Sequence, residues 1–477
     1  MKKNSINYKN KYLLKNIGLF TIGTFIPKVI IFAMVPLYTN CLSTNEYGTA
    51  DLLTNTVSLL MPILSLQIQD AVMKYSLNRK EKKSNVLNNG LFIASIGALL
   101  LFIFLVFAHL FVLFKLSIVY SLFIFLNYYV GSLNNILSYY CRGIDKVKLI
   151  TVSSILNTII TVGFNLLFLL IFKWGLTGYL LANTIGGIVR LSYLLLRDGI
   201  WHEIRIGVKD RILLKDMIFF SIPMIFSALS WWINNASDKY ILSFYEGVSI
   251  VGVYAVSSKI PSILTAFGEV ISKSFSISAI REFDSNDTDG FLSNSYSNIS
   301  SYMVLVCSFV MLFNIIIAKI LFASEFFIAW LFCPPLLLAV MFNQISLSCE
   351  NILLAMGKTK VISITAVTAA IVNTTLNFIL IPVLGAYGAA IATIVGFFVA
   401  WLIRYEKVRK YIRMRNNIRK EAISYLLIFF QMILAYWGNR YLALEILVFL
   451  LLCILFKNRI LKFICFLKRA AIGMGGV

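Results

Sequence analysis

Three basic residues stand inside apolar stretches of this sequence, where a lipid bilayer would surround them: Lys28, Arg190 and Lys259. Lys28 lies about twelve residues, or roughly 18 Å, into the first apolar run, at 1.5 Å of helix per residue. Lys259 reaches a similar depth in a later run, and Arg190 lies nearer the end of its own run. An unpaired charge at such a depth costs at least ~2.5 kcal/mol, so each of these residues is expected to have a function or a partner.

The chemistry that these residues suit is the binding of an anion. A lysine ammonium acts as a point charge that tolerates a mobile anionic group, and a proline within two residues of each lysine permits helix bending. We expect Lys28, Lys259 and Arg190 to line a cationic cavity near the middle of the membrane. The alternative is a structural role, either snorkelling to the interface or an ion pair with an acidic residue such as Asp51, Asp70, Glu269 or Glu350.

A second candidate site is the pair Asp238-Lys239, at the outer end of an apolar run. A carboxylate beside an ammonium could form a gate, or respond to protons and couple transport to a gradient. Asp70 and Glu269 are further candidates for gating or coupling, since both lie in amphipathic helical stretches. The alternative for Asp238 and Lys239 is a helix end that reaches water.

The elements that carry these residues are predicted to be transmembrane helices. The chain is 59% apolar with a mean hydropathy of +0.84, and its 13% of charged residues is far below the ~25% of soluble domains. Runs of about 20 apolar residues predict an all-α protein with about fourteen spans. The second and the eighth are amphipathic, which suggests contact with water or partner helices. The predicted spans are 17–38, 48–72, 90–113, 117–140, 149–171, 177–196, 217–237, 249–272, 300–318, 326–350, 361–381, 386–403, 422–438 and 441–456.

The basic residues predict the topology. Of the 43 lysines and arginines, 35 fall on the side of the N-terminus and 5 on the opposite side, alternating loop by loop. Cytoplasmic loops carry the excess of positive charge, so both termini are predicted to be cytoplasmic. The net charge of +22 does not indicate nucleic-acid binding, which needs basic residues gathered on a folded soluble surface.

An internal repeat predicts two bundles of six helices. The stretch from Gly175 to Gly186 matches the stretch from Gly385 to Gly396, with glycine and alanine at the same inner positions. Because six predicted helices separate the copies, both run in the same direction, which implies a pseudo-two-fold axis along the membrane normal with a site between the halves. The predicted domains are an N-terminal bundle (1–200), a cytoplasmic linker (201–216), a C-terminal bundle (217–405), a basic loop (406–421) and two extra helices with a basic tail (422–477).

No residue pattern indicates catalysis or a bound cofactor. The seven cysteines are scattered and mostly lie in apolar segments, without the spacing of a metal or disulfide framework. The two histidines, His109 and His202, have no companion ligands. Gly357-Lys358-Thr359 lacks the first glycine that a phosphate-binding loop requires. We therefore expect neither enzymatic activity, nor a metal, nor a cofactor.

The stretch from Lys215 to Pro261 resembles a known family. It contains Ser221-x-Pro223 at the opening of a helix, Trp231 and Trp232, Asp-Lys-Tyr-Ile-Leu from Asp238, and Val-Gly-x-Tyr-Ala-Val followed by Lys259-Ile260. In this order the motifs resemble the midpoint of Wzx-type flippases of polysaccharide repeat units (O-antigen or capsule). These flippases belong to the multidrug/oligosaccharidyl-lipid/polysaccharide exporter superfamily.

The resemblance implies a transporter in the bacterial inner membrane. It would flip oligosaccharide repeat units, linked to undecaprenyl diphosphate, by alternating access through a cationic central cavity, and would contact membrane lipids, a glycan polymerase and a chain-length regulator. Three alternatives stay open at this point. They are a lipid II flippase, a multidrug cation antiporter of the same superfamily, and a membrane glycan polymerase or ligase. The last should carry a large outer loop, and no predicted outer loop much exceeds a dozen residues.

Overall fold

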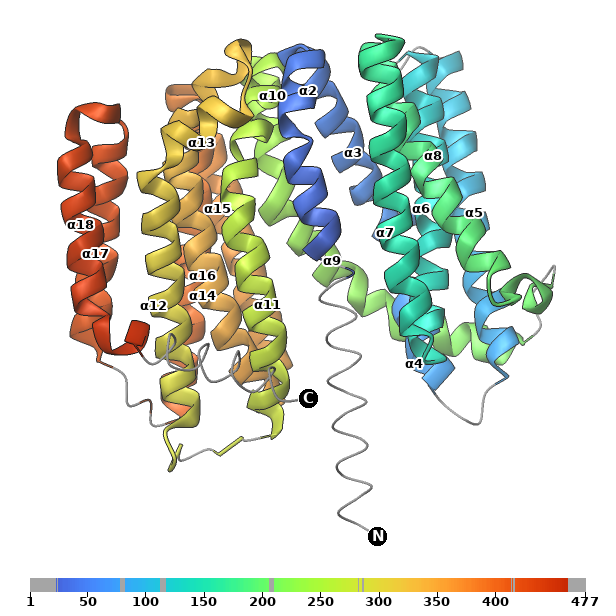
Figure 1. Ribbon diagram of the computed structural model, residues 1–477. Coiled ribbons are helices and arrows are strands. Elements are labelled where there is room, and N and C mark those ends of the chain that lie inside the picture. Colours follow the sequence, from blue (N-terminus) through green and yellow to red (C-terminus); the bar gives the residue numbers. More distant parts are fainter. Residues whose placement is uncertain are drawn as a thin grey trace, which may run out of the picture. The chain divides into compact units, whose positions relative to one another are not determined.

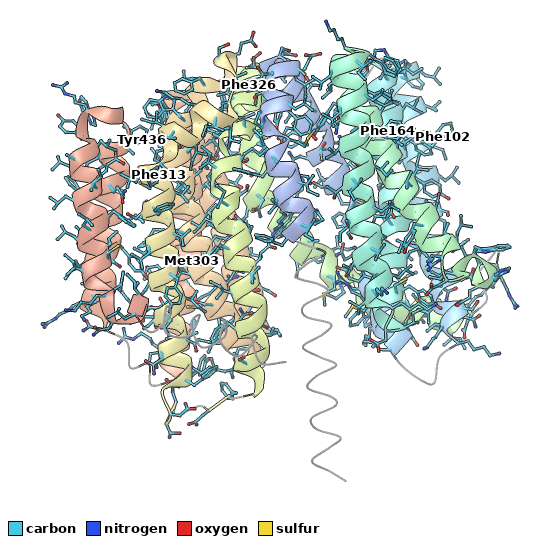
Figure 2. All side chains as sticks on the ribbon, in the orientation of Figure 1. Phe102, Phe164, Met303, Phe313, Phe326 and Tyr436 are labelled. Atoms are coloured by element: carbon cyan, nitrogen blue, oxygen red, sulfur yellow. The ribbon has the colours of Figure 1, made fainter. Side chains whose placement is uncertain are left out.

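The computed structural model describes residues 23, 25–77, 82–111, 117–205, 210–281, 283–284, 287–412, 414 and 417–461. Over these residues every regular element is a helix, and no strand occurs among them. The prediction of an all-α protein is therefore confirmed. Apolar side chains such as Phe102, half of whose surface is exposed, cover the outer faces of the helices (Figure 2). This arrangement is what a bilayer-embedded protein requires, because lipid tails contact apolar surface without penalty.

Eight helices in the described part of the chain are long and apolar enough to cross a membrane, and up to ten spans result if each bent pair counts as one. The bent pairs are α3 (Thr44–Leu64) with α4 (Ile68–Leu77), at 56°, and α10 (Val248–Ser257) with α11 (Lys259–Arg281), at 42°. They coincide with the second and eighth predicted spans, the two that the sequence analysis describes as amphipathic. The chain is a multi-pass membrane protein.

The other predicted spans are also helical. They correspond to the helix Phe25–Cys41, to α6 (Ile118–Gly143), to α17 (Ile418–Ala435) and to α18 (Leu442–Leu455). The start of the first predicted span lies outside the described residues. Each of the fourteen apolar runs thus coincides with helix where the structure describes it, although length and composition alone identify eight to ten spans.

The chain divides into two compact units, Met1–Ala236 and Ser237–Val477. In the first unit, the long helices α5, α6, α7 and α8 lie side by side (Figure 1). Buried apolar residues hold them together in two clusters, one around Tyr140 and one around Tyr128. Apart from α3, α4 and α6, whose bounds are given above, the elements of this unit are α2 (Val35–Cys41), α5 (Lys83–Leu110), α7 (Val147–Asn165), the π-helix η1 (Leu166–Ile171), α8 (Gly175–Leu196), the 3-10 helix η2 (Ile200–Glu203) and the start of α9 (Arg211–Glu246).

In the second unit, α14 lies at the centre and packs against α11, α12, α15, α16 and α17. Its sequence explains this position, because its side chains are almost all apolar or small and are largely buried. Apart from α10, α11, α17 and α18, whose bounds are given above, the elements of this unit are α12 (Phe291–Leu312), α13 (Asn314–Leu321), the 3-10 helix η3 (Ser324–Leu331), α14 (Cys333–Ala355), α15 (Thr359–Leu384), α16 (Ala386–Tyr411) and the 3-10 helix η4 (Gly438–Tyr441).

The linker predicted at 201–216 is bound to the first unit over its described residues. Asn88 of α5 donates from Nδ2 to the Glu203 carbonyl at 2.9 Å, and its Oδ1 accepts from the backbone N–H of Arg205 at 2.6 Å. Asn89 donates to the Asp210 carbonyl at 3.1 Å. These bonds fix the chain where it enters α9, so the first turns of that helix belong to the first unit.

The predicted repeat is visible in how two helix pairs pack, α7 with α8 and α15 with α16. Gly186 lets α8 approach α7 so closely that an added Cβ would lie 2.0 Å from Thr161 Oγ1. At the equivalent Gly396, an added Cβ would lie 3.0 Å from Asn373 Cβ of α15. Both glycines therefore allow a close approach of the two helices, and the contact at Gly186 is the tighter one.

The two extra helices are fastened to the second unit by buried polar contacts. Gln431 of α17 donates from Nε2 to the Ser308 carbonyl of α12 at 3.1 Å, and its Oε1 accepts from the Ser308 hydroxyl. Glu421, which is 5% exposed, accepts from the Ser297 hydroxyl at 3.1 Å. Such bonds are hard to exchange inside a bilayer, where no water replaces them, so α17 and α18 form a fixed part of this unit.

Candidate functional site

A polar cavity of about 290 Å³ lies inside the first unit. Hydroxyls of Thr54 and Tyr179 contribute to its wall. Its other polar side chains are five amides and one guanidinium, namely Asn127, Asn134, Asn135, Asn157, Asn183 and Arg190. No aspartate or glutamate lines it among the residues that the structure describes. So many uncharged polar groups inside apolar helices are costly, and in membrane proteins they mark a functional path.

Helical spacing gathers these side chains on facing surfaces. Asn127, Asn134 and Asn135 are seven and eight residues apart on α6, so they share one face of that helix. Asn183 and Arg190 are seven residues apart and share one face of α8. The glycines Gly131 and Gly187 also line the cavity. Because glycine has no side chain, these positions leave the polar groups room around them.

The hydrogen bonds of the cavity are incomplete. Arg190 Nη2 donates to the Ser138 hydroxyl at 2.9 Å, and Asn127 Nδ2 donates to Thr184 Oγ1 at 2.8 Å. Asn134 Nδ2 donates to the Gly187 carbonyl at 2.9 Å. The buried atoms Arg190 Nε and Asn134 Oδ1, however, have no hydrogen-bond partner in the described part of the chain. Buried polar groups nearly always have partners, so these two unpaired groups mark the cavity wall as incompletely hydrogen-bonded.

The chemistry of this wall is that of a site for hydroxyl and anionic groups. Amides and hydroxyls both donate and accept, which matches sugar hydroxyls. A guanidinium matches phosphate or carboxylate through two parallel N–H bonds. Arg190 was predicted to bind substrate, with snorkelling to the interface as the alternative. Its contact with Ser138 and its position in the cavity wall favour the first interpretation.

Lys28 lies half-buried in the helix Phe25–Cys41 of the first unit. This helix runs along α7, because an added Cβ on Gly23 would touch Thr151 and the Asn165 amide donates to the Tyr38 hydroxyl at 3.1 Å. Lys28 is not among the residues that line the polar cavity.

Lys259 lies in the second unit, at the break in the bent span. It is the first residue of α11, immediately after the 42° bend that follows α10, and it is half-buried. Glu269 lies on the same helix ten residues further on and is half-buried too. A distance of about 15 Å along the helix axis separates the two, so they form no ion pair. Lys28 and Lys259 therefore belong to different units, and a common cavity for them stays a prediction.

Asp238 is buried, with 6% of its surface exposed, which contradicts the alternative of a helix end reaching water. Its Oδ2 accepts from the Tyr254 hydroxyl at 3.0 Å and its Oδ1 from the backbone N–H of Lys239 at 2.9 Å. The Thr393 side chain of α16 lies near the Tyr254 hydroxyl. Thr393 accepts in turn from Asn373 Nδ2 at 3.5 Å. Asp238 thus belongs to a buried group of polar side chains contributed by α9, α10, α15 and α16.

The remaining acidic candidates have other neighbours. Asp70 is half-buried in the first turn of α4, and its Oδ2 accepts from Gln67 Nε2 at 3.3 Å. Glu350, one of the acidic residues weighed as a partner for the buried lysines, instead binds Arg404 Nη1 at 2.8 Å. Within the second unit, Glu350 therefore pairs with an arginine and not with Lys259.

The asparagines of the cavity were missed by the sequence analysis, which attended to charged residues alone. A signal was present, since Asn134-Asn135 and Asn183 interrupt apolar runs at positions that share a helix face with Asn127 and Arg190. Arg404 was also missed, because the predicted span 386–403 ends one residue before it. The helix α16 continues to Tyr411 and buries Arg404, which is 6% exposed.

The fold resembles solved membrane transporters. A lipid II flippase, MurJ, in an inward closed conformation superposes with a TM-score of 0.70 at 16% identity, covering 93% of this chain and 99% of that one. A multidrug resistance MATE family transporter in an inward-facing conformation reaches a TM-score of 0.64 at 15% identity, covering 83% and 97%. At this identity the likeness concerns the fold. No curated protein matches the chain.

The fold is thus the one shared by a lipid II flippase and a multidrug resistance transporter. The family profile described as polysaccharide biosynthesis protein matches residues 13–273, more than half of the chain. The chain belongs to this family, and the resemblance to Wzx-type flippases of the multidrug/oligosaccharidyl-lipid/polysaccharide exporter superfamily is confirmed.

Proposed function

We propose that this protein flips an oligosaccharide repeat unit, linked to undecaprenyl diphosphate, from the cytoplasmic to the outer face of the bacterial inner membrane. The observation that carries the proposal is the cavity of the first unit, whose polar wall combines asparagine amides with Arg190 and lacks carboxylates among its described residues. A glycan cannot cross hydrocarbon unaided, because each unpaired polar group costs several kcal/mol. The amides would replace water around the sugar hydroxyls, and the guanidinium would bind a diphosphate or an acidic sugar.

Lys28 and Lys259 complete the proposed set of cationic residues. Both interrupt apolar segments within two residues of a proline and are half-buried. We propose that each attracts the diphosphate as the substrate passes, with the two units moving in alternating access and both termini in the cytoplasm. A glycan polymerase and a chain-length regulator are the proposed partners on the product side.

Asp238 is the residue that we propose for coupling. A carboxylate that is 6% exposed and joined to Tyr254 can exchange a proton or cation, and a change in its charge would alter its hydrogen bond to Tyr254 of α10. Lys239, Asp70 and Glu269 stay predicted contributors to gating.

The proposal is tested in proteoliposomes that contain a labelled prenyl-diphosphate oligosaccharide. Transport is measured as the fraction of labelled glycan that becomes accessible to a glycosidase added outside. We expect the wild type to move the glycan, and the double variant Lys28→Ala with Lys259→Ala to lose most of this activity. The variant Lys82→Ala with Lys83→Ala removes two exposed cations of the first unit and should transport normally.

Two other substrates are tested in parallel. If lipid II is flipped and the oligosaccharide is not, the protein is a lipid II flippase. If an organic cation is exported against a proton gradient while no glycan moves, it is a multidrug antiporter. The buried carboxylate of Asp238 favours this second candidate, and Asp238→Asn would then abolish export. A flippase coupled to protons through Asp238 should instead lose only the pH dependence of its transport in that variant.

A further inference from the structure

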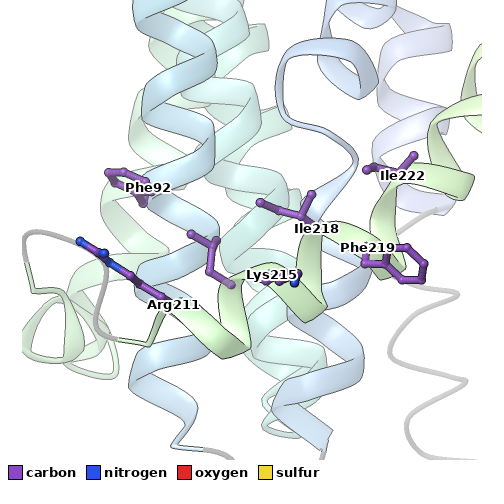
Figure 3. Close-up of a pocket in the computed structure, with 7 residues that line it drawn as sticks. Phe92, Arg211, Lys215, Ile218, Phe219 and Ile222 are labelled. Carbon is purple, nitrogen blue, oxygen red and sulfur yellow. The ribbon is translucent and has the colours of Figure 1, made fainter.

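A second cavity, open along the first turns of α9, differs in character from the asparagine cavity. It has a volume of about 680 Å³ and lies between α5 and α9. Figure 3 shows Arg211 and Lys215 along the beginning of α9, with Phe92 of α5 across from them and Ile218, Phe219 and Ile222 further along. We call this cavity the α5–α9 groove.

The first turns of α9 have one face buried in the protein, one exposed face, and a third face that lines the groove. Leu213 and Met217, one turn apart, are buried in the core of the first unit. Ile212 and Phe219, seven residues apart, are about four-fifths exposed, at 78% and 80%. Between these two faces lie the side chains that line the groove. The segment is thus an amphipathic helix with one side in the protein and another side against lipid.

The groove is built on a fixed backbone. Asp210 caps α9, since its Oδ1 accepts from the backbone N–H groups of Ile212 and Leu213 at 3.1 and 3.0 Å. The Asp210 carbonyl accepts in turn from Asn89 of α5 at 3.1 Å. Because α5 and the start of α9 are tied at this point, the two walls of the groove keep their separation.

Two cations stand at one end of the groove, and their charge is not neutralised. Arg211 and Lys215 are four residues apart and so project from the same side of α9. Within the described residues, no hydrogen bond or ion pair engages their charged ends. No carboxylate belongs to the described lining, and the side chain of the nearby Asp210 is committed to the helix cap. The groove therefore carries two positive charges beside an apolar wall.

We propose that the α5–α9 groove binds a membrane phospholipid with a net negative headgroup. Arg211 and Lys215 would bind the headgroup phosphate, and Phe92, Ile218 and Ile222 would contact an acyl chain. This order of groups, cations followed by apolar side chains, matches the order of groups along such a lipid. The proposal goes beyond the transported substrate and does not depend on which one is correct.

A lipid fits these observations better than a protein partner does. The exposed Phe219 and Ile212 next to the groove require an apolar surrounding, which the bilayer supplies. The positive-inside count predicts that this end of α9 faces the cytoplasm, where the leaflet is rich in anionic lipid and each basic residue gains about 1 kcal/mol from it.

The test measures lipids that stay bound after purification. Protein is reconstituted in vesicles of equal parts phosphatidylglycerol and phosphatidylcholine and extracted in mild detergent, and retained lipids are counted by mass spectrometry of the intact complex. We expect the wild type to retain phosphatidylglycerol in preference to phosphatidylcholine. The variant Arg211→Ala with Lys215→Ala should bind phosphatidylglycerol about thirtyfold more weakly, the equivalent of about 2 kcal/mol for two cations.

Two further variants make the outcome decisive. Lys82→Ala with Lys83→Ala removes the same charge from exposed positions of the first unit and should keep the preference. Ile218→Trp fills the groove while leaving both cations in place, and should reduce retention as well. Equal retention of the two lipids by the wild type, a normal preference in the Arg211/Lys215 variant, an equal loss in the Lys82/Lys83 variant, or unchanged retention in Ile218→Trp would each overturn the proposal.

Discussion

The two units contain equivalent helices that each carry an arginine, half-buried in α8 and buried in α16, and the two arginines differ in their surroundings. Arg190 of α8 has one hydrogen bond, to Ser138, and its Nε is without a partner among the described residues. Arg404 of α16 binds Glu350 at 2.8 Å and also donates to Thr365 and Ser346, each at 3.0 Å. The guanidinium of Arg404 is neutralised by its own unit, whereas that of Arg190 faces an open cavity.

The comparison shows how one repeat can serve two purposes. The helix pairs α7–α8 and α15–α16 pack through glycines at matching positions. The polar groups around the two arginines differ. An arginine that pairs with a carboxylate holds helices together, whereas an arginine surrounded by amides can still bind an anion. We infer that the second unit uses its arginine for structure, and that substrate contacts on α8 have no counterpart on α16.

The largest expected effect comes from breaking the ion pair of the second unit. Arg404→Ala would leave Glu350 charged and largely surrounded by protein, and should lower the free energy of unfolding by about 3 kcal/mol. Thermal unfolding in detergent measures this loss. The double variant Arg404→Met with Glu350→Gln leaves no charge unpaired and should recover most of the stability. An Arg404→Ala protein as stable as the wild type would contradict a structural role.

The next effect concerns the cavity of the first unit. Arg190→Ala should reduce transport of the labelled glycan by about tenfold to a hundredfold, since a hydrogen bond to a charged group contributes about 1.5–3 kcal/mol. Its melting temperature should change little, because the guanidinium has a single protein partner. Arg190→Lys keeps the charge without the planar fork and should have intermediate activity. The comparison between the units fails if Arg190→Ala loses stability and keeps transport.

A smaller difference is expected between the two packing glycines. An added methyl at Gly186 would overlap Thr161, so Gly186→Ala should destabilise the protein by about 1–2 kcal/mol after the helix preference of alanine is included. At Gly396 the added Cβ would lie 3.0 Å from Asn373, and the gain in helix preference should nearly cancel the strain. Unfolding temperatures of the two variants, compared side by side, give the answer. Equal losses would show that the two interfaces are equally tight.

The smallest effect is predicted for a single amide of the cavity. Asn134→Ala removes one donor and the unpaired Oδ1 acceptor, and should reduce glycan transport by roughly threefold to tenfold, the equivalent of about 1 kcal/mol. Asn377→Ala, which removes a buried amide of the second unit, should leave transport unchanged and serves as the control. A stronger effect from the control would move the candidate site to the second unit.

Much of the fold was predictable from the sequence because the bilayer makes severe demands on it. Backbone groups in hydrocarbon need internal partners, so about twenty apolar residues in a row can only be a helix. For this reason the predicted spans coincide with helices, and the two amphipathic ones proved to be the bent pairs. The predicted end of the span 386–403 was wrong, since a partner such as Glu350 can hold the charge of Arg404 inside a helix that hydropathy alone would end.

The candidate site could be predicted from the sequence only in part. The sequence by itself determined which charged residues interrupt the apolar runs, among them Arg190 and Asp238. These residues can be recognised without a structure because a charge inside an apolar helix has a high free-energy cost in a bilayer. Only the tertiary structure decided that Arg190 faces five asparagines and that Asp238 meets Tyr254. It also decided that Glu350 neutralises Arg404. The physical reason is that a helix determines which side chains share its own face, while the partner of each face is chosen by packing between helices distant in the chain.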